Sequence, residues 1–201
     1  MRIELGKFKD KIQIPYGIFK CDCSDKEVPE DELREAIVNF KREWGRKLYK
    51  IFGEDPTKFR PSSESLWRRI QKGNSFPRVH PAVDAINMLS LINSIPYGLY
   101  DFSKIKGEKI IVRTGKKGEG YEGIRRGWIN LEGRLLLEDE EGPFGNPTGD
   151  SLRTAVSKGT EVFLYIIFAP KDYPSIEANR ITMEKLKKWL NAEIIEYGVR
   201  R

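Results

Sequence analysis

The sequence predicts a single α+β domain over residues 1–201, with mixed β-sheets and packed helices. Hydrophobic residues make up 39% of the chain and aromatic residues 11%, which is enough apolar side chain to build a core. Helical spacing dominates the first half, whereas short apolar runs separated by glycine dominate the second. No internal repeat, low-complexity tract or linker divides the chain, so one α+β domain is the simplest arrangement.

Two elements are expected before residue 54. Residues 12–21 predict a strand with a turn or bulge at Pro15–Gly17. From Pro29 to Gly53, apolar residues recur at helical spacing and acidic residues gather in the first turn, so one amphipathic helix is predicted there. A loop and a short helix follow, with Ser62 or Ser63 as the expected N-cap and Gly73 as the stop signal.

The segment from Pro81 to Ser103 is almost uncharged, since Asp84 and Asp101 are its only charged residues in a chain that is 33% charged. Pro81 marks a helix start, and we expect the helix after it to be buried nearly all round. Asp84 and Asn87 would then need polar partners in the core. Pro96 ends the helix, and the following residues predict a strand that delivers Asp101 to its end.

The remaining elements are mostly strands. Strands are predicted at residues 109–113 and 134–140, with a loop or hairpin at 114–127 between them and a turn-rich loop after them. Residues 161–169 predict a central strand buried on both faces. A helix over 174–192 and an edge strand over 193–197 complete the domain, and Ile181, Leu186, Trp189 and Leu190 are expected to point inward from that helix.

Charge gives a first indication of function. The formal net charge is +6 and the sequence pI is about 9.2, while glutamine is nearly absent, as in proteins of heat-loving organisms. Residues 60–78 hold five basic residues against Glu64, and residues 104–126 hold eight against three acidic ones. Such clusters are typical of a polyanion-binding surface, and a solvated charged face is the alternative.

Cysteine and histidine usage argues against several enzyme classes. The two cysteines, Cys21 and Cys23, suit neither a disulfide framework nor a zinc site, and His80 is the only histidine. We therefore expect no metal and no cofactor, and no triad hydrolase. The N-terminus lacks a charged-then-apolar leader, and the longest apolar run is about half a membrane span, so a cytoplasmic protein with no membrane partner is expected.

Residues 59–101 carry a family resemblance. The motif Arg68–Arg69–Ile70, the run Val83–Asp84–Ala85–Ile86–Asn87, Pro96 and the strand end Tyr100–Asp101 resemble the B3/B4 domain of the phenylalanyl-tRNA synthetase β subunit. The resemblance is closer still to the small freestanding proteins made of that module alone. It covers roughly residues 55–169 and leaves 1–54 and 170–201 as flanking elements of the same domain.

The resemblance implies an editing activity. The synthetase module hydrolyses the ester of a mischarged aminoacyl-tRNA in a pocket between two subdomains, without a metal or a nucleophilic residue. Asn87 would occupy the pocket position that can polarise a carbonyl or hold a water, with capping of core backbone as the alternative. Asp84 is a second catalytic candidate, although a structural pairing with Arg68, Arg69 or Arg113 is favoured for it.

The expected substrate pocket departs from the family pattern. Its residues would be Ile86, Pro96, Gly98 and Asp101. Ile86 replaces a threonine and Gly98 a histidine, which implies a roomier, more apolar or differently shaped pocket. The hydroxyl-reading glutamate of the later subdomain has no confident match, and Glu138 to Glu141 are better explained as a solvated acidic turn.

The resemblance also implies the acceptor end of tRNA as a partner. Its phosphates would contact basic residues, with Arg68 or Arg69 held back for a structural role. Trp128 could stack on a base or belong to the core. The basic candidates are Arg60, Arg68, Arg69, Lys72, Arg78, Lys116, Lys117, Arg125 and Arg126.

Three hypotheses follow. The first is a trans-editing factor, an aminoacyl-tRNA deacylase. The second is a non-catalytic module that binds tRNA or a small amino-acid-like ligand. The third is an accessory subunit that docks on a synthetase.

Overall fold

Strand β9 (Val162–Ile167) lies in the middle of a sheet in the computed structural model, which describes residues 1–24 and 26–201. It pairs antiparallel with β2 (Ile12–Lys20) on one side and with β3 (Tyr97–Asp101) on the other. The far side of β2 pairs with β11 (Glu193–Arg200), and the short β10 (Ala169–Pro170) follows β9 along β2. The predicted central strand and the predicted last edge strand are both confirmed.

A second sheet contains a parallel pair. Its order is β1 (Arg2–Glu4), β4 (Lys109–Thr114), β7 (Leu135–Asp139) and β8 (Gly142–Gly145), with β1 and β4 parallel and the other pairs antiparallel. A separate hairpin is formed by β5 (Gly120–Gly123) and β6 (Gly127–Asn130). The expectation of mixed β-sheets in an α+β fold is therefore correct.

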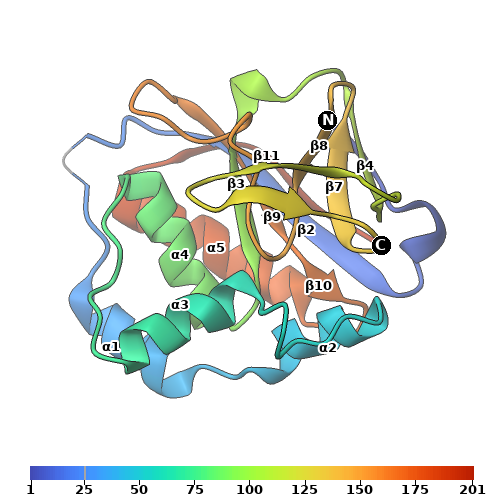
Figure 1. The fold of residues 1–201 in the computed structure, drawn as a ribbon. Helices are drawn as coiled ribbons and strands as arrows, with labels where there is room; N and C mark the ends of the chain where they lie inside the picture. Colours follow the sequence, from blue (N-terminus) through green and yellow to red (C-terminus); the bar gives the residue numbers. More distant parts are fainter. Residues whose placement is uncertain (25) are drawn as a thin grey trace.

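Alternating side chains of β9 explain its unbroken apolar sequence. Phe163 and Tyr165 enter a core that is shared with α4 (Pro81–Ile92) and α5 (Ser175–Leu190). Leu164 and Ile166 enter a second core shared with β4 and β7. Because successive side chains of a strand point to opposite faces, a strand covered on both faces must be apolar throughout. Figure 1 shows α4 and α5 on one side of the β2–β9–β3 sheet and the β4–β7–β8 sheet on the other.

The near-neutral helix is buried almost all round, as predicted. Most of its side chains belong to the first core, and only Pro81, Val83, Asn87 and Ile92 are partly exposed. Its N-cap is His80, whose Nδ1 accepts a hydrogen bond from the Ala82 amide at 3.2 Å.

The helix predicted over residues 29–53 is in fact two helices, α1 (Glu30–Asn39) and α2 (Glu43–Ile51). Phe40 is extended between them (φ −61°, ψ 127°) and stacks on Trp67 with ring centroids 5.5 Å apart. The Lys41 amide, freed by the break, donates to the Ser94 hydroxyl at 2.9 Å. Apolar spacing continues across the break although Ala36 of α1 lies in the first core and Leu48 of α2 in the second, so periodicity alone does not reveal it.

The short helix is α3 (Ser62–Gln71), and its cap differs from the prediction. Pro61 is the N-cap and makes no side-chain capping bond, while Ser62 and Ser63 lie inside the helix. Two single 3₁₀ turns, η1 (Gly6–Phe8) and η2 (Phe102–Lys104), complete the elements. None of the helices among the described residues is long and apolar enough to cross a membrane.

Candidate functional site

A carboxyl group with an unusual environment lies where the loop after β8 meets strand β3. Asp150 Oδ1 accepts a hydrogen bond from the Tyr100 hydroxyl at 2.8 Å, and Oδ2 lies 3.5 Å from the Leu99 amide. Burial raises the pKa of Asp150 to about 7, although the two hydrogen bonds and the nearby Arg126 charge act in the opposite direction. A carboxyl that titrates near neutral pH can exchange protons as a general acid or base.

Two glycines make room for the Tyr100 ring that holds Asp150. A Cβ added to Gly98 would lie 2.0 Å from the Tyr100 hydroxyl oxygen, and one added to Gly145 would lie 2.1 Å from it. Gly98 and Tyr100 are two residues apart on β3 and therefore share a face. The expectation of a roomier pocket at Gly98 is not met, because the fully buried Tyr100 side chain occupies that space.

The loop that carries Asp150 is held firmly. Asn146 Oδ1 accepts hydrogen bonds from the amides of Thr148 and Gly149 at 2.7 and 3.1 Å. The Thr148 hydroxyl lies 2.6 Å from both the Arg134 guanidinium and the Tyr49 hydroxyl. Such a network fixes the Asp150 backbone before any ligand arrives, which is the preorganisation that catalysis needs.

The turn of the β5–β6 hairpin packs against this loop. The Ile124 amide donates to the Asp150 carbonyl at 3.1 Å, and a Cβ added to Gly149 would lie 3.6 Å from Arg126 Cδ. Two exposed apolar side chains, Ile124 and Leu152, flank the contact, and Trp128 on β6 is 64% exposed. Trp128 is therefore not a core residue, and its indole is free to stack on a base.

A basic groove begins at the same hairpin turn. Its cavity of about 680 Å³ is lined by Arg34, Arg69, Arg78 and Arg125, together with one acidic residue, Glu30, and exposed Val79. The structure thus brings three of the predicted tRNA-binding residues together and adds Arg34. Arg34 was not predicted because it lies in an acidic run, with seven acidic residues against two basic in residues 22–35.

The other predicted basic residues are dispersed. Arg68 forms an ion pair with Glu64, one turn away on α3 (3.4 Å), and a structural role for it stays a prediction. The remaining residues are exposed and lie outside the groove: Arg60, Lys72, Lys116, Lys117 and Arg126. Of these, Arg126 is the one that approaches Asp150.

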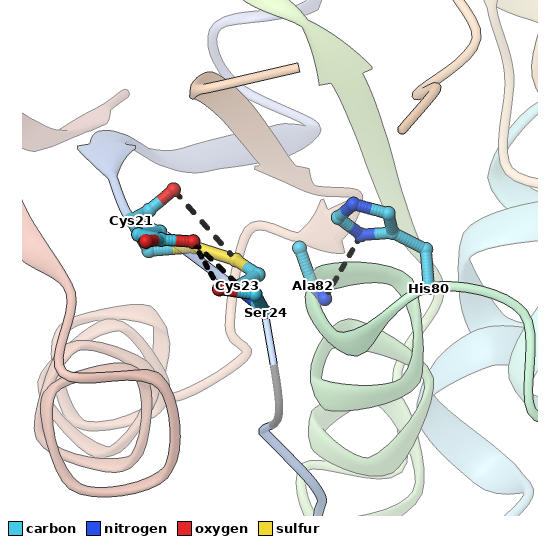
Figure 2. Close-up of a disulfide and its surroundings, with 6 residues drawn as sticks. Cys21, Cys23, Ser24, His80 and Ala82 are labelled. Atoms are coloured by element: carbon cyan, nitrogen blue, oxygen red, sulfur yellow. Dashed lines mark hydrogen bonds between the residues drawn. A yellow bond between two sulfur atoms is a disulfide. The ribbon is translucent and has the colours of Figure 1, made fainter. Parts of the chain in front are cut away.

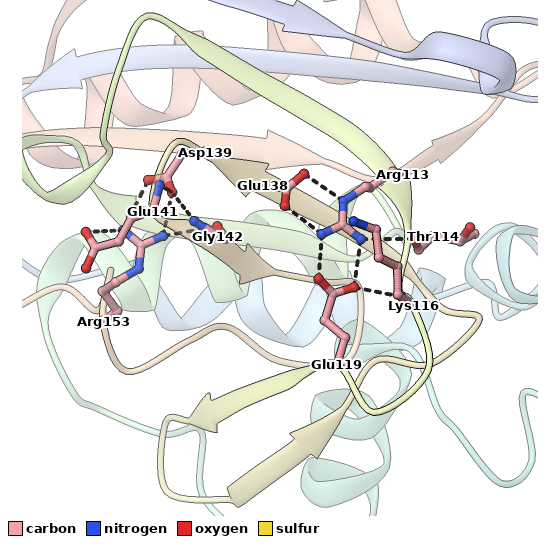
Figure 3. A network of polar contacts seen from close by, with 9 residues as sticks. All are labelled: Arg113, Thr114, Lys116, Glu119, Glu138, Asp139, Glu141, Gly142 and Arg153. Atoms are coloured by element: carbon pink, nitrogen blue, oxygen red, sulfur yellow. Dashed lines mark hydrogen bonds and ion pairs between the residues drawn. The ribbon is translucent and has the colours of Figure 1, made fainter.

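Asp84 does not pair with the arginines expected for it. Its carboxylate accepts a hydrogen bond from the Val79 amide at 3.0 Å, and burial raises its pKa. Arg113 instead forms ion pairs of 2.6 Å with both Glu119 and Glu138, as Figure 3 shows. A backbone amide, and not a cation, therefore satisfies the Asp84 carboxylate.

The residues expected to line a pocket around Asn87 are tightly packed. None of the cavities that we describe within residues 1–24 and 26–201 is lined by Ile86, Pro96 or Gly98, and Ile86 belongs to the first core. Asp101 accepts hydrogen bonds from Ser103 and Thr160 at 2.6 and 2.7 Å, which satisfies it structurally. Asn87 is partly exposed, and its main-chain carbonyl accepts from the Ser90 hydroxyl. Its catalytic role stays a prediction.

The cysteines and the histidine meet at a different cavity. Figure 2 shows Cys21 and Cys23 joined by a disulfide close to His80, and all three line a cavity of about 720 Å³. Cys21 and Cys23 are thus bonded to each other, where the sequence suggested no disulfide framework. The bond closes a loop over one residue and so constrains little of the chain. No cluster of three or more potential metal ligands occurs in the described part of the chain.

Comparisons with known proteins place these observations in a family. A sequence model of the B3/4 domain matches residues 45–184. Among solved structures, the chain is similar to an N-terminal fragment of the phenylalanyl-tRNA synthetase β subunit from Pyrococcus horikoshii, with 16% identity and a TM-score of 0.48. That match covers 96% of this chain and 50% of the fragment. No curated protein matches the chain.

Proposed function

Since the chain belongs to the B3/4 domain family, we propose that it acts in trans as a deacylase on mischarged aminoacyl-tRNA. The observation that carries the proposal is the Asp150 carboxyl, with a pKa of about 7, next to a groove lined by four arginines. Arg125 and Arg126 are consecutive residues of one turn, and they link the groove to the carboxyl. Arg125 lines the groove and the charge of Arg126 acts on Asp150, so one turn of the β5–β6 hairpin connects the two.

The chemistry requires one base and a fixed water. The Asp150 carboxylate accepts a proton from a water whose oxygen adds to the ester carbonyl. The tetrahedral adduct then collapses, the ribose oxygen leaves, and Asp150 returns the proton to it, which gives free amino acid and tRNA. General base catalysis of this kind contributes on the order of 10²- to 10⁴-fold. An aminoacyl ester is already activated, so this contribution and positioning are sufficient.

The remaining surface fits the rest of the substrate. Arg69, Arg78 and Arg125 would contact acceptor-end phosphates, which supply most of the affinity for a nucleic acid. Trp128 offers an exposed indole to an unpaired terminal base. This arrangement moves the proposed catalytic group from Asn87 and Asp84 to Asp150.

The test is deacylation of a panel of mischarged tRNAs by the wild-type chain and by Asp150→Asn. We expect release of amino acid from at least one tRNA, and a loss of about 100-fold or more in Asp150→Asn. Asp10→Asn, an exposed aspartate remote from the site, is the matched control and should retain the wild-type rate. No turnover of any tRNA above background would refute the proposal.

A second candidate is a module that binds tRNA or an amino-acid-like ligand without turnover. The closed packing of Tyr100 between Gly98 and Gly145 favours it, because that packing leaves little space beside Asp150. Salt-dependent tRNA binding without deacylation, or a rise in melting temperature with a free amino acid, would support this alternative.

A further inference from the structure

The outer edge of strand β11 is open and apolar. Tyr197 and Ile195 are 60% and 54% exposed, and Ile176 on the adjacent helix α5 is 63% exposed. A groove of about 560 Å³ runs between α5 and β11. Its apolar lining is Ile176, Met183, Tyr197 and Val199, and Arg180 and Arg201 lie at it as well. Among the described residues β11 pairs only with β2, so one side of its backbone has no strand partner.

The register with β2 shows which backbone groups face outward. Asn179 Nδ2 donates to the carbonyls of both Tyr16 and Gly198, at 3.4 and 3.1 Å, so these two carbonyls lie in the seam between β2 and β11. In an antiparallel pair the N–H and C=O of one residue point to the same side and alternate along the strand. The groups of Tyr197 and Val199 therefore point away from β2. Val199 lies opposite Pro15 in β2. Proline has no N–H to donate to Val199, which agrees with the Val199 backbone groups pointing away from β2.

The charges of β11 are arranged to suit a copy of itself. Acidic Glu193 and Glu196 lie in its first half, and basic Arg200 and Arg201 lie at its end. An antiparallel copy would set the acidic half of one strand against the basic half of the other, whereas a parallel copy would oppose like charges. With Gly198 opposite Gly198, Arg200 of the second copy would face Glu196. The Glu196 carboxylate also accepts from the Met1 ammonium (2.9 Å) and the Tyr16 hydroxyl (2.8 Å) of its own chain.

The same register fills the apolar groove. Tyr197 and Val199 share the α5 face of β11, and in this register Tyr197 lies opposite Val199 of the second copy. A two-fold axis normal to the sheet keeps α5 of both copies on one face, so Ile176 and Met183 extend the contact beyond the strands. Strands alone would not reach the roughly 1,200–2,000 Å² that stable interfaces bury.

We propose that two copies of this chain form a dimer by antiparallel pairing of their β11 strands about a two-fold axis at Gly198, with the α5–β11 grooves facing each other. The two β11–β2–β9–β3 sheets then become one continuous sheet. Pairing also removes an exposed edge that would otherwise accept other chains.

The test is sedimentation equilibrium of the whole chain at several concentrations, without nucleic acid. We expect the wild type to approach twice the chain mass in the micromolar range, and Tyr197→Lys to weaken dimerisation at least about tenfold, since lysine on a strand edge opposes pairing. Val38→Lys, which changes an exposed residue of α1 that is remote from this edge, is the matched control and should dimerise like the wild type.

Amide hydrogen exchange gives an independent measurement. Exchange at Tyr197 and Val199 should slow as protein concentration rises, whereas exchange at exposed amides of α1 should not change. A monomer at all concentrations, or an oligomer that Tyr197→Lys leaves intact, would overturn the proposal. So would a monomer whose α5–β11 groove binds tRNA. Deacylation is measured separately, so failure of the dimer and failure of the deacylase are distinguishable.

Discussion

Asp84 and Asp150 are two aspartates of one chain whose pKa values are both raised by burial, yet they lie in different settings. Asp84 sits at the start of α4 and accepts from the Val79 amide in the turn that begins the helix. Asp150 lies in a loop and accepts from the Tyr100 hydroxyl, which a strand 50 residues away supplies. Asp84 secures a local turn, whereas Asp150 joins two sheets.

The ion-paired carboxylates of the same domain provide the contrast. Hydrogen bonds from Arg113 lower the pKa of Glu119 to about 2, and Arg153 pairs with Asp139 at 2.8 Å (Figure 3). Glu119 therefore stays charged at any ordinary pH, and both ion pairs hold loops together. A buried carboxyl without a cationic hydrogen-bond partner is therefore the one expected to take part in proton transfer.

Gly98→Ala is expected to have the largest effect on Asp150. The added Cβ would collide with the Tyr100 hydroxyl, so the ring must move and Asp150 must lose its donor. We expect a loss of about 1–3 kcal/mol in unfolding free energy and a fall in deacylation of about 100-fold. Chemical denaturation and tRNA deacylation measure the two effects. Gly159→Ala, where the Cβ would meet open space, should change neither; equal effects in both variants would contradict the packing argument.

Asp84→Asn tests whether Asp84, like Asp150, is needed for deacylation. The amide oxygen can still accept from Val79, but more weakly than a carboxylate, so we expect a loss of about 1 kcal/mol in stability. Deacylation should stay within about threefold of the wild type. If Asp84→Asn lost as much activity as Asp150→Asn while remaining folded, the catalytic group would belong on α4, as the sequence suggested.

The pH dependence of unfolding stability tests the raised pKa of Asp150. The folded pKa of Asp150 lies near 7, above its ordinary value of 3.8. The folded state therefore binds the proton more tightly, and this contribution to stability is complete below pH 4 and is lost as the pH rises to about 7. Denaturation midpoints of the wild type should fall across that window relative to Asp150→Asn. Deacylation should rise over the upper part of the same window, and parallel stability curves for the two proteins would argue against the assigned pKa.

The smallest effects are expected in the basic groove. Arg69→Ala, Arg78→Ala and Arg125→Ala should each weaken tRNA binding and lower the slope of log affinity against log salt by about 0.7–0.9. Arg2→Ala, an exposed arginine outside the groove, serves as the control. The measurement is tRNA binding by fluorescence anisotropy at several salt concentrations. Unchanged slopes for all three groove variants would show that tRNA binds outside the groove.

Elements marked by a periodic apolar pattern or by local turn and capping residues were predicted from the sequence. The central strand, α4 and the β-rich second half follow from apolar spacing and length. The break at Phe40 was missed because the spacing continues through it. Asp150 was missed because the residues around it, Gly145 to Ser151, have the composition of an ordinary turn. Its raised pKa comes from packing against β3, which no short stretch of sequence contains.

Tyr100 belongs to β3 of one sheet, and its ring lies edge-on to Phe144 of β8 in the other, with ring centroids 4.9 Å apart. Its hydroxyl passes beside Gly145 to reach Asp150. The Tyr100 side chain thus connects the two sheets. A shift of one sheet relative to the other would move the Tyr100 hydroxyl away from the Asp150 carboxylate. The protonation of Asp150 therefore depends on how the two sheets are aligned.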